Sequence, residues 1–439
     1  DEFNKRALEI NLPLWWGQDK NQNQALDPDE MLPIWGLNFQ VDPKRWYQDG
    51  GFSKAFDDAY QAVVEYPMVD TGDPKEVYRK ELLRKELSQG HFTVVESDLR
   101  GLLPNEKKLV QHVLRAATFV EQIYAKQVGS FGLDSTIAIN DLLSRLVFFV
   151  NQGPWCSAPL TEKDTECNSL KDQPSKLSGL YPQTLQVEKD FCALLRAHPA
   201  SKDLLQPFSV VADTPDGKYQ AIPYHEAYKT EMQAVSQELK AAAALTSKDE
   251  TAFRAYLLAA AQAFLDDNWP AADEAWAKMN AENSQWYLRI GPDETYFEPC
   301  SEKAGFHVSF ARINKDSLAW QQKLDPFKSA MEKVLAQHTG APYAARQVNF
   351  HLPDFIDVVL NAGDSRSPRG ATIGQSLPNW GPVANEGRGR TVAMTNFYTD
   401  PDSVQRLRAQ VESLFCQDSM QSYSDTPDGL LLSTVLHEA

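Results

Sequence analysis

The feature that most constrains the fold of this chain is a change in hydrophobic periodicity near Trp286. Before that point, apolar residues recur at the three- and four-residue spacing of amphipathic helices, most regularly over 109–124, a stretch preceded by Pro104. After it, residues 306–313 alternate their side chains between two faces, as a strand does. Helices followed by a small group of strands and further helices predict an α+β protein, predominantly α-helical, with two lobes.

Further elements follow from local patterns. Ser247 and Glu250 have the spacing of a capping box at the start of another helix. A Thr-Pro-Asp-Gly turn at 214–217 predicts a hairpin, and strands are expected on both sides of a Gly- and Pro-rich loop. The expected helices cover 74–87, 134–150, 185–198, 228–239, 318–338 and 403–416, and the expected strands cover 347–361 and 390–396.

Length and charge limit the possible functions. The 439 residues are enough for about two or three domains with real cores. A formal net charge of −17 argues against a nucleic-acid or anionic-membrane partner, because both require clustered Lys and Arg. The same acidity is compatible with a cleft that receives a positive group, such as a peptide amino terminus. No apolar run approaches the roughly 18 residues of a membrane span.

The five cysteines have no Cys-x-x-Cys spacing, which argues against a structural zinc knuckle. Cys156 and Cys167 flank a polar segment that a disulfide would close in an oxidising compartment, whereas Cys192, in an apolar run, is expected to be plain core. The charged start at residues 1–6 has neither Met nor an apolar signal region, which indicates a mature or trimmed start. A periplasmic or secreted location, with a lipid anchor left open, is therefore favoured over the cytoplasm.

The chain ends one residue after His437-Glu438, the first half of a His-Glu-x-x-His motif. In that motif two imidazoles on one helical face hold Zn²⁺ and the Glu deprotonates the metal-bound water. The same pair at 225–226 has Lys229 in the place of the second His, so the dipeptide alone favours an ordinary helix end. The run 429–436 is the apolar lead-in expected of a buried zinc helix.

Two other segments carry chemistry. In Gly-Pro-x-Glu-x-Tyr at 291–296, an extended backbone would put Glu294 and Tyr296 on one face, as an amine-binding carboxylate and an O–H donor for an oxyanion. The alternative is a turn with solvated acids and a core tyrosine. In Leu-Pro-Asn at 377–379, Asn379 is placed to reach an extended ligand, although turn chemistry without function is the default interpretation of the pattern.

From about Leu102 to its end, the chain resembles the dipeptidyl peptidase III family, particularly the bacterial and plant branch that includes proteins fused to a Nudix domain. The resemblance depends on the order and approximate spacing of several short motifs. These are Phe-Val-Glu-Gln-Ile-Tyr at 119–124, Ile-Pro-Tyr at 222–224, Ala-Trp at 275–276, the segments at 291–296 and 377–379, and the final His-Glu.

The resemblance implies two lobes around a wide peptide-binding cleft, one helical and carrying zinc, the other with a small β-barrel core. Residues 1–314 would form the lower lobe with the start of the barrel, and 315–358 an excursion into the upper lobe. Residues 359–404 would return as barrel strands. The upper zinc lobe would start at 405–439, with the rest missing.

By the same resemblance, Glu294 would bind the free amino terminus of the substrate and Tyr296 would stabilise the tetrahedral oxyanion. Asn379 would pair with the substrate backbone. The family has a second asparagine three residues earlier, and this chain has Ser376 there, which puts full substrate specificity in doubt.

His437 would be the first zinc ligand and Glu438 the general base, with the other ligands beyond Ala439. The expected function is therefore that of a zinc-dependent metallopeptidase, an exopeptidase of the dipeptidyl-peptidase type that releases short peptides from peptide amino termini. The alternative is a non-catalytic peptide- or ligand-binding protein with the same cleft. A missing carboxy-terminal part or a second chain would complete the metal site.

Overall fold

The structure is a computed structural model whose longest continuous described part covers residues 101–315. The other described residues are 2–9, 14–17, 19, 21–23, 25–27, 30–33, 47–48, 51–65, 72–90, 97, 99, 322–323, 325–345, 354–366, 373–426, 428–429 and 432–434. None of the described helices is long and apolar enough to cross a membrane.

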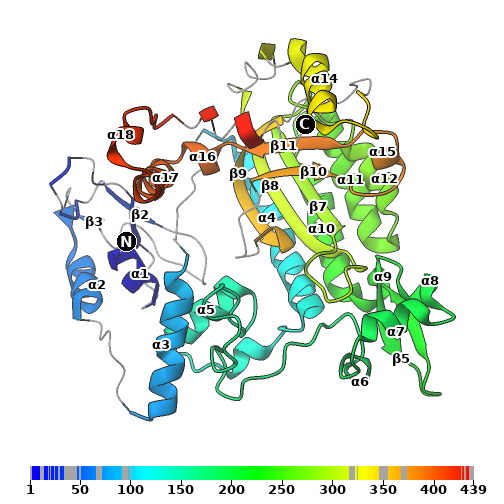
Figure 1. Ribbon diagram of the computed structural model, residues 1–439, viewed down its shortest axis with the longest axis horizontal. Coiled ribbons are helices and arrows are strands. Elements are labelled where there is room, and N and C mark those ends of the chain that lie inside the picture. The colour runs from blue at the N-terminus through cyan, green and yellow to red at the C-terminus, as the bar shows by residue number, and fades with distance from the viewer. Residues whose placement is uncertain are drawn as a thin grey trace.

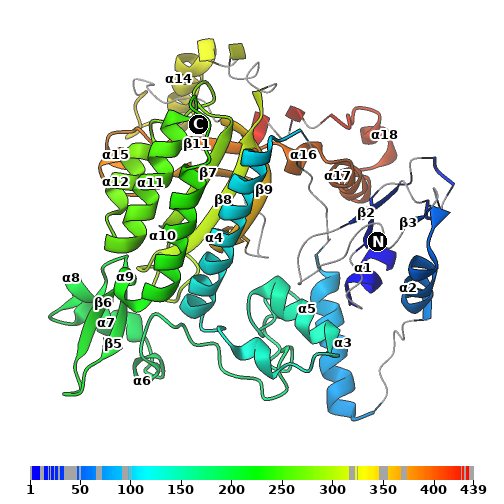
Figure 2. The same cartoon turned by 180° about the vertical axis from the view of Figure 1, so that it is seen from behind.

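A layer of helices covers one face of the central sheet, as the two opposite views show (Figure 1, Figure 2). The layer consists of α4 (Pro104–Val128), α10 (Lys229–Ala243), α11 (Thr251–Asp266) and α12 (Trp269–Trp276). Helix α4 starts with proline at its first turn and ends at Gly129, whose φ of 80° lets its N–H reach the last carbonyls. Its buried face is the one that the periodicity predicts.

The central sheet has five strands in the order β10-β11-β9-β8-β7. They are β7 (Trp286–Glu294), β8 (Gly305–Ile313), β9 (Asp354–Gly363), β10 (Gly374–Leu377) and β11 (Arg390–Met394). All neighbours are antiparallel except β11 and β9, which run parallel. Strands β10 and β7 are the two ends of the described sheet, so its closure into a small barrel stays a prediction. Helices with a separate sheet confirm the α+β class.

Aromatic side chains fill the space between the helices and the sheet. Trp276, Trp286 and Phe306 are fully buried there, and Trp276 also donates its indole N–H to the carbonyl of Leu288 at 2.9 Å. Each buried aromatic side chain contributes about 1.5–3 kcal/mol of hydrophobic stabilisation, so the sheet is held firmly against its helices.

A second, smaller core lies around α1 (Glu2–Glu9), α3 (Pro74–Ser88) and α5 (Leu142–Asn151), apart from the central sheet (Figure 1). The remaining described elements are short or peripheral. They are β1 (Leu14–Trp16), β2 (Met31–Pro33), β3 (Tyr47–Gln48), β4 (Gly51–Phe52), α2 (Lys54–Glu65), α6 (Gln183–Gln186), α7 (Phe191–Ala197), α8 (Ser201–Leu204), β5 (Ser209–Asp213), β6 (Tyr219–Pro223), α9 (Tyr224–Ala227), α14 (Lys328–Thr339), α15 (Pro382–Asn385), α16 (Asn396–Thr399), α17 (Pro401–Leu414) and α18 (Gln417–Met420).

Some local predictions are confirmed and others are wrong. The hairpin forms as β5 and β6. The capping box does not form, because the Glu250 carboxylate instead accepts hydrogen bonds from Ser284 Oγ (2.6 Å) and the backbone N–H of Gln285 (2.8 Å). The single helix expected over 134–150 is broken, since the side chain of Asp141 accepts from the N–H of Ser144 and starts α5 there.

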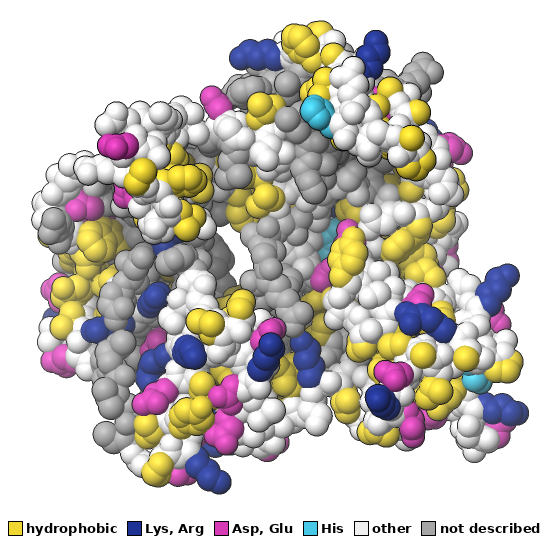
Figure 3. Space-filling model, viewed as in Figure 1, with side chains coloured by type: hydrophobic (Ala, Val, Ile, Leu, Met, Phe, Trp, Pro, Cys, Tyr) yellow, Lys and Arg dark blue, Asp and Glu magenta, His cyan; other side chains and the backbone are white. Residues whose placement is uncertain are grey.

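The visible surface mixes charges of both signs. Among the described side chains of the face in Figure 3, Lys and Arg lie interspersed with Asp and Glu rather than gathered in one large patch. This is the distribution of an ordinary solvated surface.

Candidate substrate-binding pocket

A cavity of about 820 Å³ lies beside the end of β7 and the edge strand β10. Four predicted site residues line it together: Glu294, Tyr296, Ser376 and Asn379. They come from two segments about 80 residues apart in the sequence, which the sheet brings to one place. His437 and Glu438, the predicted metal ligand and base, lie outside the described residues.

Glu294 ends β7, where the pairing with β8 shifts register between Pro292 and Glu294. Its Oε2 atom is buried and has no hydrogen-bond partner among the described residues. Tyr296 follows two residues later and is 78% exposed, so the alternative of a core tyrosine is wrong. The carboxylate of the neighbouring Glu294, aided by partial burial, raises the pKa of Tyr296 to about 12. The phenol is therefore protonated at neutral pH and able to donate.

The β10 segment supplies the opposite part of the wall. Ser376 lies on the strand and its hydroxyl is 3.1 Å from that of Thr391 on β11. Gln375 also lines the cavity, and its Oε1 is buried without a partner among the described residues. Asn379 follows the cis Leu377–Pro378 bond and donates from Nδ2 to the carbonyl of Asp293, at a long 3.4 Å. Amide and backbone groups thus face the cavity beside a sheet edge.

A buried ionic network supports this wall from behind. Arg289 donates from Nε to Asp293 Oδ2 (2.7 Å), from Nη2 to Asp293 Oδ1, and from Nη1 to Asp273 Oδ1 (2.7 Å). His307 Nε2 lies 2.5 Å from Asp293 Oδ2, and its Nδ1 lies 2.6 Å from the hydroxyl of Ser365. Because an ionised carboxylate only accepts, the Nε2 position carries the proton. His307 and Ser365 both line the cavity.

The two carboxylates in this network have opposite pKa shifts. Burial opposes the ionisation of Asp293, but the charge of Arg289 and the hydrogen bonds from Arg289 and His307 outweigh it and hold the pKa well below its usual range. For Asp273, burial outweighs the attraction of Arg289 and raises the pKa. Asp293 is therefore the main partner of the buried guanidinium.

Asp364 is a pocket residue that the sequence analysis missed. It starts the short η6 (Asp364–Arg366), directly after β9, and accepts a hydrogen bond from Tyr124 Oη at 2.9 Å. Burial raises the pKa of Asp364, and the nearby charge of Glu294 adds to the shift. A lone Asp after an apolar strand has no motif spacing, so only the fold reveals it. His307 was missed for the same reason.

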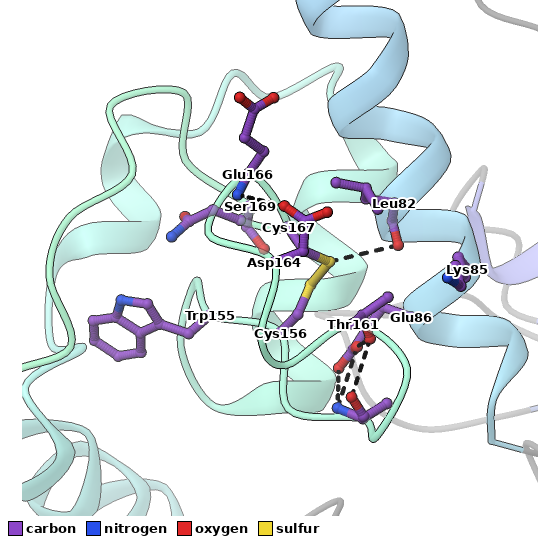
Figure 4. The surroundings of a disulfide bond; sticks show 12 residues. Leu82, Lys85, Glu86, Trp155, Cys156, Thr161, Asp164, Glu166, Cys167 and Ser169 are labelled. Carbon is purple, nitrogen blue, oxygen red and sulfur yellow. Dashed lines mark hydrogen bonds between the residues drawn. A yellow bond between two sulfur atoms is a disulfide. The ribbon is translucent and has the colours of Figure 1, made fainter.

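Two disulfides fix segments near the cavity. The Cys156–Cys167 disulfide closes the predicted loop (Figure 4). Trp155, directly before this loop, and Ser157, within it, line the pocket. The prediction that Cys192 is plain core is wrong. Cys192 forms a disulfide with Cys300, four residues after Tyr296. That pairing spans 108 residues, a separation at which sequence gives no geometric signal. The exposed Cys416 is a free thiol.

The described residues do not provide a zinc site. Within them, the group with suitable ligand atoms is Glu86 with Cys156 and Cys167. Both sulfurs are bonded to each other, and the Glu86 carboxylate accepts backbone hydrogen bonds from Ser157 (2.8 Å) and Ala158 (3.1 Å). A disulfide has no thiolate to offer, so these atoms do not fit a metal.

The fold and cavity together define an α+β protein with a partly acidic cavity at the edge of its sheet. No protein-family model matches the chain, and no curated protein does. Solved structures do match. Dipeptidyl peptidase III from Caldithrix abyssi has a TM-score of 0.67 at 23% identity, over 81% of this chain and 66% of that one. Dipeptidyl peptidase III from Corallococcus sp. strain EGB has a TM-score of 0.60 at 23% identity, over 73% of this chain and 59% of that one.

This likeness shows that the chain has a fold similar to that of dipeptidyl peptidase III, as the sequence resemblance predicts. The chain spans about two thirds or less of the length of the solved structures it matches.

Proposed function

We propose that the pocket binds the amino-terminal end of a peptide and that the chain is the substrate-binding part of a zinc-dependent exopeptidase of the dipeptidyl-peptidase type. One observation carries this proposal: Glu294 Oε2 is buried, without a partner among the described residues, in a cavity that it shares with the exposed phenol of Tyr296. A buried carboxylate oxygen without a donor is costly, and a peptide ammonium group supplies the missing donor.

The other wall residues suit an extended peptide. Strand β10 is at one end of the described sheet, and Gly374, Gln375 and Ser376 from it line the cavity. An extended peptide can pair with such an edge through main-chain hydrogen bonds, while Asn379 supplies a further amide. Tyr296 would donate a hydrogen bond from its hydroxyl group to the developing oxyanion, since its raised pKa keeps the hydroxyl protonated.

The proposed zinc site depends on the His437-Glu438 pair in the sequence. A zinc ion held in part by His437 would supply an activated water, and Glu438 would be the base. The remaining ligands would come from a further part of the protein or from a second chain. The two disulfides support a periplasmic or secreted location, because such bonds persist in oxidising compartments.

The test uses the natural protein that carries this sequence, incubated with zinc and with paired peptides whose amino termini are free or acetylated. We expect release of short amino-terminal fragments, detected by mass spectrometry, from the free peptides only. Glu294→Gln should weaken binding of the free peptides, and Glu438→Ala should abolish turnover but not binding. Glu282→Gln, at an exposed site outside the cavity, is the matched control. Binding without turnover in the unaltered protein would favour the non-catalytic alternative.

A further inference from the structure

Asp364 places a second carboxylate in the wall of the cavity that contains Glu294. Tyr124, from α4, donates its hydroxyl hydrogen to Oδ1 of Asp364 at 2.9 Å. This hydrogen bond holds the carboxylate in place without neutralising it, because a phenol at neutral pH carries no charge. Asp364 is therefore held in the pocket wall as a second carboxyl group in addition to Glu294.

The backbone around Asp364 is also held firmly. The N–H of Gly363 donates to Glu121 Oε1 at 2.9 Å, and the carbonyl of Gly363 accepts from Gln152 Nε2 at 2.8 Å. Two residues further on, Arg366 donates from Nε to the same Glu121 oxygen at 2.8 Å. With both neighbours fixed, the Asp364 side chain cannot move far from the cavity to escape the charge of Glu294.

The third acidic residue in the cavity lining, Glu298, already accepts hydrogen bonds from the protein backbone. Its oxygens accept the backbone N–H groups of Cys300 (2.8 Å) and Lys303 (2.9 Å). Glu294 and Asp364 repel each other, as the effect of Glu294 on the pKa of Asp364 shows. A cation between them would relieve that repulsion and would meet the oxygen of Glu294 for which the described part of the chain supplies no partner.

We propose that Glu294 and Asp364 together hold the ammonium group at the amino terminus of the peptide, an inference that rests on the proposed function. An ammonium group has three N–H donors, and a buried donor without an acceptor is costly. The carboxylate of Glu294 meets only part of that requirement, and Asp364, which lines the same cavity, meets more of it. Asp364 thus makes the pocket selective for a free, charged amino terminus.

The experiment uses calorimetry to compare the binding of trialanine amide with that of its N-acetyl form. Neither peptide has a charged side chain, and acetylation removes the charge of the amino terminus. The protein carries Asp364→Asn, Glu294→Gln or the control Asp357→Asn, which lies on strand β9, before Asp364, and outside the cavity lining. We expect Asp364→Asn to weaken binding of the free peptide about tenfold or more and to leave the acetylated peptide within about twofold. Asp364→Glu should restore part of the loss, and Asp357→Asn should leave the ratio unchanged.

The outcomes separate this inference from the proposed function. If Glu294→Gln removes the preference for the free peptide but Asp364→Asn leaves it intact, the second carboxylate is refuted and the proposed function stands. If the unaltered protein shows no preference, the proposed function fails as well. If Asp364→Asn weakens only a peptide that starts with lysine, Asp364 recognises a side chain and the inference is wrong. If Asp364→Asn does not fold, Tyr124→Phe tests the same claim. This variant keeps both carboxylates, and we expect it to weaken binding of the free peptide by a smaller factor.

Discussion

The substitution Asp293→Asn tests the buried ionic network behind the pocket. The side chains of Arg289 and Asp293 are only 6% and 3% exposed, and Asp293 accepts two hydrogen bonds from Arg289 and one from His307. Removal of one partner from a buried ion pair typically costs about 3–5 kcal/mol, because the other charge stays buried. Since Asp273 still pairs with Arg289, we expect the free energy of unfolding to fall by about 3 kcal/mol, at the lower end of that range.

The decrease in the free energy of unfolding caused by Asp293→Asn should depend on pH, and the pKa shift of Asp293 gives the direction. The pKa of Asp293 in the folded protein is held below its usual value of about 4, so its ionised form stabilises the fold above that pH. This stabilisation is lost as the pH falls from about 4 toward the folded-state pKa. The difference in stability between the unaltered protein and Asp293→Asn should therefore be full at pH 7 and shrink in acid.

Urea denaturation followed by tryptophan fluorescence measures this difference, because Trp276 lies 4.9 Å from the guanidinium of Arg289 and is fully buried. Asp273→Asn is the matched control. Burial already disfavours the charge of Asp273, so its replacement by a neutral amide should cost clearly less than that of Asp293. A loss below about 1 kcal/mol for Asp293→Asn, or a larger loss for Asp273→Asn, would refute the reasoning.

Three further results are expected. Gly363→Ala should lower the free energy of unfolding by about 1–3 kcal/mol in urea denaturation, because φ is +61° and a Cβ would lie 2.2 Å from the carbonyl oxygen of Phe306. Replacing Cys192 and Cys300 by serine should cost about 2–5 kcal/mol by the same measurement, and non-reducing peptide maps of the unaltered protein should contain this bond. Tyr296→Phe should reduce peptide turnover about 10²–10³-fold in the natural protein, with little change in peptide affinity by calorimetry.

The sequence predicts elements well where one periodic pattern covers the whole element. Helix α4 is such a case, because its apolar spacing and its starting proline agree with its buried face. Strand β8 also forms where the alternation predicts a strand, although its residues are buried on both faces. The predictions fail where a contact from elsewhere decides the local structure. Glu250 has the spacing of a capping box, yet its carboxylate is taken by Ser284, more than 30 residues away.

The same distinction applies to the pocket. The spacing of Glu294 and Tyr296 could be read from the sequence because both residues lie in one short segment, and the structure brings them into the same cavity. His307 lies on β8 and Asp364 directly follows β9, and their proximity to Glu294 arises only when β7, β8 and β9 pair. Motif spacing contains no information on such pairings, since they depend on sheet order rather than on the local chain.

The register shift in β7 explains how two consecutive acids acquire opposite roles. Neighbouring residues of a strand project to opposite faces, and the shift between Pro292 and Glu294 lies where β7 reaches the cavity. Asp293 points into the protein, where Arg289 and His307 compensate its charge. Glu294 lines the cavity with one buried oxygen that no described residue satisfies. The fold thus neutralises one carboxylate and leaves the next without a cation, and that asymmetry is the physical reason to expect a cationic ligand in this cavity.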